Sequence, residues 1–196
     1  MSVKISLVPI FICGFLALQA AAQDYSIKSY AFLGTGCPAG STTVATDAKN
    51  QALLARFNAF TANVGPGVPI SHSRKNCDAT LTISVPDGYK FSFNHFGYYT
   101  GYSLDKSVNA RYNTYYYFQS DIAEGGGNGN VTGLSSDLKY ISTPVSPPVW
   151  SDCGIDATVI VDTAVRVSNT ANRSGSGTFN YQQLNILPDS FTWARC

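Results

Sequence analysis

The most constraining feature of the sequence is a stretch between Asn76 and Phe93 in which apolar and polar side chains alternate. In its first half every second residue is apolar, and the apolar set is Cys77, Ala79, Leu81, Ile83 and Val85. A period of two predicts a strand with one buried face. Pro86-Asp87-Gly88 then supplies turn chemistry before Tyr89, Phe91 and Phe93 resume the alternation, which predicts a β-hairpin. An isolated hairpin is not stable in water, so a second layer must cover its apolar face.

Other segments carry the same signal. The longest runs from Ala157 to Ser168, with Thr178 to Leu187 as its expected hairpin partner, and another runs from Val108 to Gln119. In all we expect about eight or nine strands, separated by turns, at the spacing of an all-β, two-sheet antiparallel β-sandwich.

Two segments are less clear. Ala52 to Phe60 fits a helical stripe through Leu53, Leu54, Phe57 and Phe60, and it fits a strand equally well. Gly125-Gly126-Gly127-Asn128-Gly129 is predicted to be a flexible loop because of its glycine content.

Residues 1–22 have the pattern of a secretory signal peptide. Lys4 supplies a positive charge, Ile5 to Leu18 form an apolar core, and Ala20-Ala21-Ala22 offers a small-residue cleavage site. The apolar core is shorter than the roughly 20 residues that span a bilayer. We therefore expect a secreted, extracellular protein whose residues 23–196 form one β-sandwich domain.

The charge of the mature chain narrows the choice of partners. Loss of Lys4 with the signal peptide leaves equal numbers of basic and acidic side chains, without a basic run. Nucleic acid and anionic membranes both require a basic excess, so neither is an expected partner. A cell-wall polysaccharide or an extracellular protein is left as the candidate partner.

Four cysteines remain after the signal peptide, namely Cys37, Cys77, Cys153 and Cys196. An even number in an exported chain indicates two disulfides. Among three possible connectivities we favour Cys37 with Cys77 and Cys153 with Cys196, because each bond then closes one half of the chain. Loops of that length remove about 4 kcal/mol of unfolded-state entropy each. A zinc site is the alternative, but the cysteines stand singly and have no nearby histidine.

The residues around these cysteines form a spaced set of motifs: Gly36-Cys37-Pro38-Ala39-Gly40, Arg74-Lys75-Asn76-Cys77, Leu81-Thr82-Ile83-Ser84-Val85-Pro86 with Gly88, Tyr116-Tyr117-Phe118, Cys153-Gly154 and Trp193-Ala194-Arg195-Cys196. The set resembles a family of small secreted proteins abundant in fungi, which is catalogued only as a domain of unknown function. The resemblance implies an all-β secreted domain with two disulfides, and it favours a strand for Ala52 to Phe60. It implies no activity and no catalytic residues.

The sequence contains no recognisable catalytic motif. His72 and His95 are the only histidines, neither lies in an HExxH pattern, and there is no GxSxG elbow. We therefore assign no catalytic residue and no cofactor. A small secreted hydrolase is kept as an alternative, with His95 as the base beside Asp87 or Asp105, because hairpin ends converge.

The segment after the strand from Val108 to Gln119 carries possible metal ligands and one of the two sequons in the chain. Asp121, Glu124, Asn128 and Asn130 offer oxygen ligands for calcium but match no defined spacing, so we assign no metal site. Asn130-Val131-Thr132 and Asn172-Arg173-Ser174 are sequons, which predicts N-glycosylation at Asn130 and Asn172.

The strand from Val108 to Gln119 supplies the candidate ligand-binding residues. Tyr115 and Tyr117 fall on the face opposite the apolar one, about 7 Å apart, flanked by Arg111 and Asn113. Exposed rings at that spacing could stack on sugar rings while the polar neighbours bind hydroxyl groups. The competing interpretation is that the aromatic segment Tyr98 to Tyr102 covers both rings.

The leading hypothesis for function is therefore a non-catalytic, disulfide-stabilised protein acting at the cell wall, the extracellular matrix or a host surface. A carbohydrate-binding module that uses the exposed tyrosines is the alternative from the class of binding modules.

Overall fold

The computed structural model describes residues 24–196, so the predicted signal peptide lies outside the described residues and stays a prediction. Apart from two short 3-10 helices, Ile70–His72 and Pro188–Ser190, the regular secondary structure of the described chain consists of strands. The strands are β1 (Ile27–Leu33), β2 (Thr42–Asp47), β3 (Ala52–Phe57), β4 (Thr61–Val64), β5 (Arg74–Ile83), β6 (Tyr89–Phe93), β7 (His95–Leu104), β8 (Asn109–Phe118), β9 (Glu124–Thr132), β10 (Ser135–Pro144), β11 (Ala157–Ser168), β12 (Gly177–Ile186) and β13 (Phe191–Arg195).

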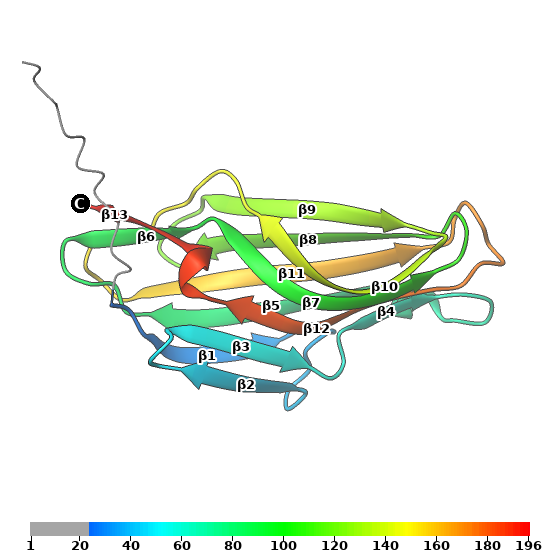
Figure 1. The fold of residues 1–196 in the computed structure, drawn as a ribbon, viewed down its shortest axis with the longest axis horizontal. Helices are drawn as coiled ribbons and strands as arrows, with labels where there is room; N and C mark the ends of the chain where they lie inside the picture. Colours follow the sequence, from blue (N-terminus) through cyan, green and yellow to red (C-terminus); the bar gives the residue numbers. More distant parts are fainter. Residues whose placement is uncertain (1–23) are drawn as a thin grey trace, which may run out of the picture.

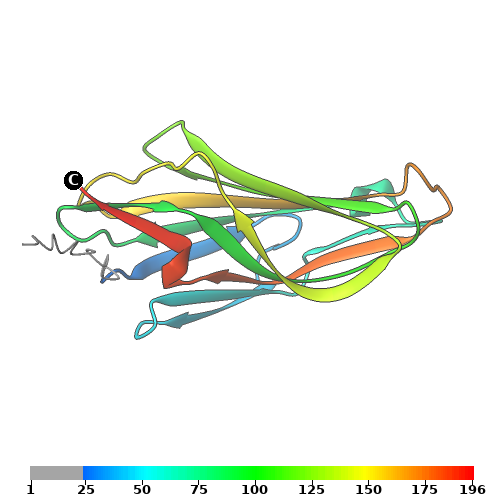
Figure 2. The same cartoon turned by 45° about the horizontal axis from the view of Figure 1, so that its top comes forward.

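Two antiparallel sheets pack face to face (Figures 1 and 2). Sheet A has five strands in the order β1-β5-β11-β8-β9, and sheet B has the path β10-β7-β12-β3-β2, with β4 paired to β12. A short ribbon of β13 and β6 lies at the end of the sandwich that holds the C-terminus. The all-β antiparallel sandwich predicted from the alternating segments is confirmed.

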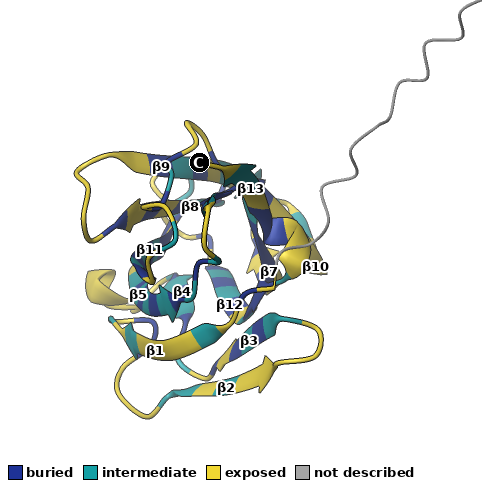
Figure 3. Ribbon diagram, turned by 90° about the vertical axis from the view of Figure 1, so that its left-hand side faces the viewer, coloured by how far each residue is buried: buried dark blue, intermediate teal, exposed yellow. Residues whose placement is uncertain are grey.

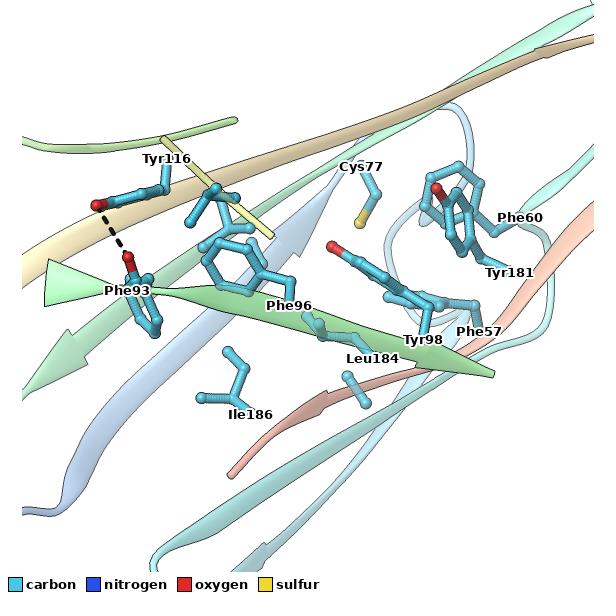
Figure 4. Packing of buried hydrophobic residues seen from close by; sticks show 14 of the residues in the cluster. Phe57, Phe60, Cys77, Phe93, Phe96, Tyr98, Tyr116, Tyr181, Leu184 and Ile186 are labelled. Atoms are coloured by element: carbon cyan, nitrogen blue, oxygen red, sulfur yellow. Dashed lines mark hydrogen bonds between the residues drawn. The ribbon is translucent and has the colours of Figure 1, made fainter. Parts of the chain in front are cut away.

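The core lies between the two sheets and is rich in aromatic residues. In the end-on view, β1 and β2 are mostly exposed, whereas β7 and β12 carry many buried residues (Figure 3). The largest fully buried side chains include Tyr98, Tyr116 and Tyr181, packed among phenylalanines (Figure 4). Two of these tyrosines have hydrogen-bonded hydroxyls: Tyr98 Oη lies 2.6 Å from Thr163 Oγ1 of the facing sheet, and Tyr116 Oη accepts from the Val149 N–H at 2.9 Å. These bonds meet the requirement that a buried hydroxyl keep a partner.

Both predicted disulfides are present. Cys37, in the turn after β1, is bonded to Cys77 of β5, with 5.4 Å between the Cα atoms. Cys153 is bonded to the terminal Cys196, with 6.2 Å between the Cα atoms. The second bond holds β13, and with it Trp193, against the end of the sandwich.

The two predicted hairpins are wrong as pairings, although all four strands exist. β5 pairs with β1 and β11 in sheet A, whereas β6 pairs with β13 in the separate ribbon. Likewise β11 lies in sheet A and its expected partner β12 lies in sheet B. In β6 the residues Phe91, Ser92 and Phe93 are all buried, so both faces of this strand are covered. The predicted hairpin required one face of β6 to be exposed to solvent, and this strand has no such face between Phe91 and Phe93.

The structure settles the two unclear segments. Ala52–Phe57 forms β3 with Leu53 and Ala55 fully buried, so the strand interpretation is correct. The predicted glycine-rich loop is wrong, because residues 125–129 lie within β9 and pair with β8. The glycines are required for close approach: a Cβ added to Gly127 would lie 2.0 Å from the carbonyl oxygen of Pro144. With β4, β7, β9 and β10 included, the described chain has more strands than the pattern indicated.

Candidate functional site

Strand β8 places the predicted ligand-binding residues on the outer face of sheet A. Its burial alternates along the chain, with Ala110, Thr114 and Tyr116 buried. On the opposite face the side chains of Tyr115 and Tyr117 are 36% and 37% exposed. The segment that was expected to cover them does not do so, because Tyr98 to Tyr102 belongs to β7 in the opposite sheet. Both rings are therefore open to solvent on one side.

A groove of about 550 Å³ runs over this face between β8 and the edge strand β9. Three of the four predicted residues line it, namely Arg111, Asn113 and Tyr115, whereas Tyr117 does not. The other wall comes from β9 and includes Asn128 and Asn130. Cross-strand register explains this set, since Asn113 lies opposite Asn128 and Arg111 lies opposite Asn130. The groove thus combines two tyrosines, Tyr112 and Tyr115, with one guanidinium group and several amides.

The position of the Tyr115 ring depends on a glycine. Tyr115 lies opposite Gly126 in the β8–β9 register, and a Cβ added to Gly126 would lie 2.1 Å from Tyr115 Cδ1. The ring therefore lies directly over the backbone of β9. Any other residue at 126 would displace it, because real side chains do not approach so closely.

Three arginines form a row across β5, β11 and β8 on the same face, near the end of the sheet where β5 begins. Arg166 of β11 lies opposite Arg74 of β5 on one side and opposite Arg111 of β8 on the other. All three side chains are exposed, and none makes a hydrogen bond or an ion pair within residues 24–196. A second groove of about 290 Å³ is lined by Arg111 and Arg166 with Asn109 and Ser168, so it adjoins the first. The sequence pattern does not indicate Arg74 and Arg166, because they become neighbours of Arg111 only through strand pairing.

An aspartate pair lies further along the same face. Asp78 of β5 and Asp162 of β11 are directly opposite each other. Burial raises the pKa of the Asp162 carboxyl, the charge of Asp78 raises it further, and Arg74 lowers it. Asp162 Oδ1 is buried without a hydrogen-bond partner in the described chain. Two carboxylates do not make a metal centre, and residues 24–196 contain no group of three acidic, histidine or cysteine side chains that could hold an ion.

The residues considered for hydrolysis are not brought together. His95 begins β7, and its Nδ1 contacts the side chain of its neighbour Asn94. Asp105 follows the other end of β7, about 30 Å away along a ten-residue strand. Asp87 lies in the turn before β6, so that strand separates it from His95.

The two sequons differ in their surroundings. Asn130 is exposed on β9, lines the larger groove and makes no hydrogen bond within the part of the chain that the structure describes. Asn172 lies in the turn between β11 and β12, where its Nδ2 donates to the Lys106 carbonyl at 2.9 Å and its Oδ1 accepts from Ser174 Oγ at 3.0 Å. Glycosylation at both positions stays a prediction.

Sheet B also carries two exposed rings on its outer face. Tyr99 of β7 and Tyr140 of β10 lie opposite each other, with 5.2 Å between ring centroids and side chains 49% and 40% exposed. Tyr140 lies over Gly97, since a Cβ there would meet its hydroxyl. These rings contact each other, whereas Tyr115 borders a groove lined by amides.

Comparison with known proteins places the chain in a family. Residues 23–196 match the family described as Domain of unknown function (DUF4360). The chain belongs to the DUF4360 family. The resemblance drawn from the cysteine motifs is therefore confirmed.

A curated relative supports the secreted location of this DUF4360 chain. It is an "Uncharacterized secreted protein" of Arthroderma benhamiae, 29% identical over 140 residues, which cover 70% of this chain and 57% of the relative. The chain thus spans little more than half the length of that relative. The predicted secreted location is confirmed. Between residues 24 and 196, no helix is long and apolar enough to cross a membrane.

Solved structures similar to the DUF4360 fold include two carbohydrate-binding modules. One is TmCBM61 in complex with beta-1,4-galactotriose, with a TM-score of 0.34 and 12% identity over 87% of this chain and 91% of that one. Another is a family 11 module from Clostridium thermocellum in complex with a mixed-linked tetrasaccharide, with a TM-score of 0.24 and 10% identity over 82% of this chain and 94% of that one. At these scores the likeness carries no argument about ligand, which must rest on the site itself.

Proposed function

We propose that this DUF4360 protein is a secreted, non-catalytic β-sandwich that binds carbohydrate on the outer face of sheet A, at the cell wall, the extracellular matrix or a host surface. The observation that carries the proposal is the Tyr115 ring, fixed over Gly126 at the border of a groove lined by amides. A sugar presents an apolar ring face and a set of hydroxyl groups. This groove offers a partner for each.

The hydrogen-bonding capacity of the groove is suited to hydroxyl groups. Asn113, Asn128 and Asn130 each carry a carbonyl oxygen that accepts and an amide nitrogen that donates, and a hydroxyl can use both. Their side chains make no hydrogen bonds to other described residues, so they are available to a ligand. A site with convergent polar groups beside an aromatic ring is the usual arrangement for small polar ligands.

Rigidity adds to the case. The groove is formed by two paired strands of a disulfide-stabilised sandwich, and Tyr115 is held from below by backbone. A ring already in place loses little conformational freedom when a ligand binds. Tyr117 lies one row further along β8, outside the groove, where it could extend the platform for a longer saccharide.

The test uses the mature protein on insoluble chitin, glucan and cellulose, on whole walls, and on soluble glycans by affinity electrophoresis. The double variant Tyr115→Ala/Tyr117→Ala is expected to lose glycan binding. Both residues are more than one third exposed, so truncating them should cost no more stability than truncating rings of similar exposure on the other sheet. The matched control is Tyr99→Ala/Tyr140→Ala on sheet B, which removes two rings of similar exposure and should retain binding.

Three results would overturn the proposal. Binding lost in the sheet B variant and retained in the sheet A variant would place the site on the other face. Failure of every glycan and wall preparation to bind would remove carbohydrate as the ligand and leave an extracellular protein as the partner. A stability loss several kcal/mol larger in the sheet A variant than in the sheet B control would show that the sheet A rings serve packing.

A further inference from the structure

The row of Arg74, Arg166 and Arg111 is costly for the isolated protein. Neighbouring strands lie about 4.8 Å apart, so the three Cα atoms span only about 10 Å. Like charges directly opposite each other on a sheet are destabilising. A general excess of basic residues does not explain the row, because the formal net charge of the whole sequence is only +1.

The charges of the row are not balanced locally. The only ion pair in the described part of the chain joins Lys28 to Asp156. The nearest acidic side chains on this face of β5 and β11 are Asp78 and Asp162, four residues along each strand from the arginines, or about 13 Å. Arg74 lowers the pKa of the Asp162 carboxyl, but none of the three arginines forms an ion pair among the described residues.

We propose that the ligand of this face is an acidic polysaccharide, whose carboxylate groups bind the arginine row while its hydroxyl groups and ring faces bind the adjoining groove. The proposal rests on the carbohydrate-binding function proposed above and adds the chemical class of the sugar. Guanidinium groups bind carboxylates through paired, charge-assisted hydrogen bonds, which are stronger than those between neutral groups.

The two grooves are arranged for such a chain. The smaller one is lined by Arg111 and Arg166, the larger one by Tyr115 and the amides, and both include Arg111 and Asn109. A saccharide lying across β11, β8 and β9 would therefore meet charge at one point and hydroxyl-binding groups about 7 Å further along the strands. The site matches a polymer that carries both acid and hydroxyl groups on its sugar units.

A nucleic acid is not the favoured ligand of the same face. Its binding rests on many phosphate contacts and on a basic excess. The mature chain has equal numbers of basic and acidic side chains, and this face offers a single row of three arginines. The amides and the Tyr115 ring of the adjoining groove match the hydroxyl groups and ring faces of a sugar.

The experiment compares three probes on the mature chain: polygalacturonate, the same polymer with its carboxyl groups methyl-esterified, and a single-stranded oligonucleotide. We expect polygalacturonate to bind at least tenfold more tightly than the ester, and its affinity to fall as sodium chloride rises from 50 to 300 mM. Arg111→Gln/Arg166→Gln should reduce polygalacturonate affinity at least tenfold and remove most of that salt dependence. The matched control is Arg56→Gln, an exposed arginine on β3 of sheet B, which should leave affinity unchanged.

The outcomes separate this inference from the function on which it rests. Polygalacturonate and its methyl ester could bind equally, with binding lost in Tyr115→Ala/Tyr117→Ala and unaffected by Arg111→Gln/Arg166→Gln. That result would overturn the inference of an acidic ligand and leave the proposed carbohydrate binding in place. No binding of either polymer, with none to neutral glycans, would overturn both. Oligonucleotide binding as tight as that of polygalacturonate would show capture of any polyanion and would also overturn the inference. Far-ultraviolet circular dichroism and urea midpoints confirm that each variant is folded.

Discussion

Adjacent glycines of β9 allow a sharp test of the site and of the fold together. Gly126 faces outward beneath Tyr115, whereas Gly127 faces inward, where a Cβ would lie 2.0 Å from the Pro144 carbonyl oxygen. Gly127→Ala must push backbone away by about 1 Å to reach the 3.0 Å below which real Cβ contacts are essentially never found. Overpacking of this kind costs about 1–3 kcal/mol. Reduced freedom of the unfolded chain offsets about 0.4–1 kcal/mol of that.

The expected net loss for Gly127→Ala is therefore about 1–2 kcal/mol. Gly126→Ala has the same effect on the unfolded chain and displaces only the Tyr115 ring, which is 36% exposed, so its stability should stay within about 0.5 kcal/mol of wild type. It should nevertheless lose glycan binding, because the ring no longer borders the groove in the same position. Gly127→Ala should keep it at temperatures where the protein is folded.

Guanidinium chloride denaturation gives the two stabilities, and affinity electrophoresis gives the binding. The two substitutions are chemically identical and one residue apart, so each controls for the other. A Gly127→Ala protein as stable as wild type would refute the close packing of residues 143–147 on β9. A Gly126→Ala protein with wild-type affinity would refute the role of the Tyr115 position.

Four further outcomes are expected. Leu81→Ala should cost about 2–5 kcal/mol in urea denaturation, because Leu81 is fully buried; a loss below about 0.5 kcal/mol would contradict its place in the core. Asp162→Asn should stabilise the protein at pH 7 by about 0.5 kcal/mol by removing repulsion from Asp78. Folding raises the Asp162 pKa, so the native carboxyl is stabilised when protonated and this advantage should shrink towards pH 3; a gain independent of pH would contradict it. Burial raises the pKa of Tyr98 to about 12 from 10.0, so the unfolded chain loses its proton first and stability should fall between pH 10 and pH 12, by at most about 1.4 kcal/mol per pH unit; unchanged stability up to pH 12 would contradict the shift. Protein glycosylated at Asn130 should bind polygalacturonate more weakly than Asn130→Gln from the same host, because the glycan would lie in the groove; equal affinities with the sequon shown occupied by mass spectrometry would contradict that placement.

The sequence predicted individual strands far better than their partners. The alternation within β5 and within β6 depends only on which face of each strand is buried, and that is visible locally. Their pairing depends on distant segments, since β5 is bonded to β11 and β6 to β13. The short Pro-containing turn at Pro86 suggested a hairpin, yet it carries the chain from sheet A to the terminal ribbon. Turn chemistry shows where a chain bends and not which strand receives it.

For the candidate site too, the positions within one strand could be predicted and the neighbours on other strands could not. Arg111, Asn113 and Tyr115 could be placed on one exposed face from the period of β8 alone. Arg74 and Arg166 could not, because their alignment with Arg111 is a matter of register between strands far apart in the sequence. Tyr117 lies on the same face by the same period, yet it does not line the groove. The extent of the groove depends on β9, which forms its other wall and which the glycine content predicts to be a loop.

The glycines of β9 serve both faces of an edge strand. On the inner face, Gly125 and Gly127 leave room for the backbone of Pro147 and Pro144. This close approach lets Ser146 exchange two backbone hydrogen bonds with Gly126, at 3.0 and 3.1 Å, which occupies part of an edge otherwise open to another strand.

On the outer face, the same absence of a side chain at Gly126 lets Tyr115 lie over the strand, at the border of the groove that Asn113 and Asn128 line. A β-branched residue at any of these glycines would raise the local strand propensity. At an inward-facing position it would push β9 away from the backbone of residues 144–147, and at Gly126 it would displace the Tyr115 ring. The low strand propensity that suggested a loop is therefore a consequence of what β9 must accommodate on its two sides.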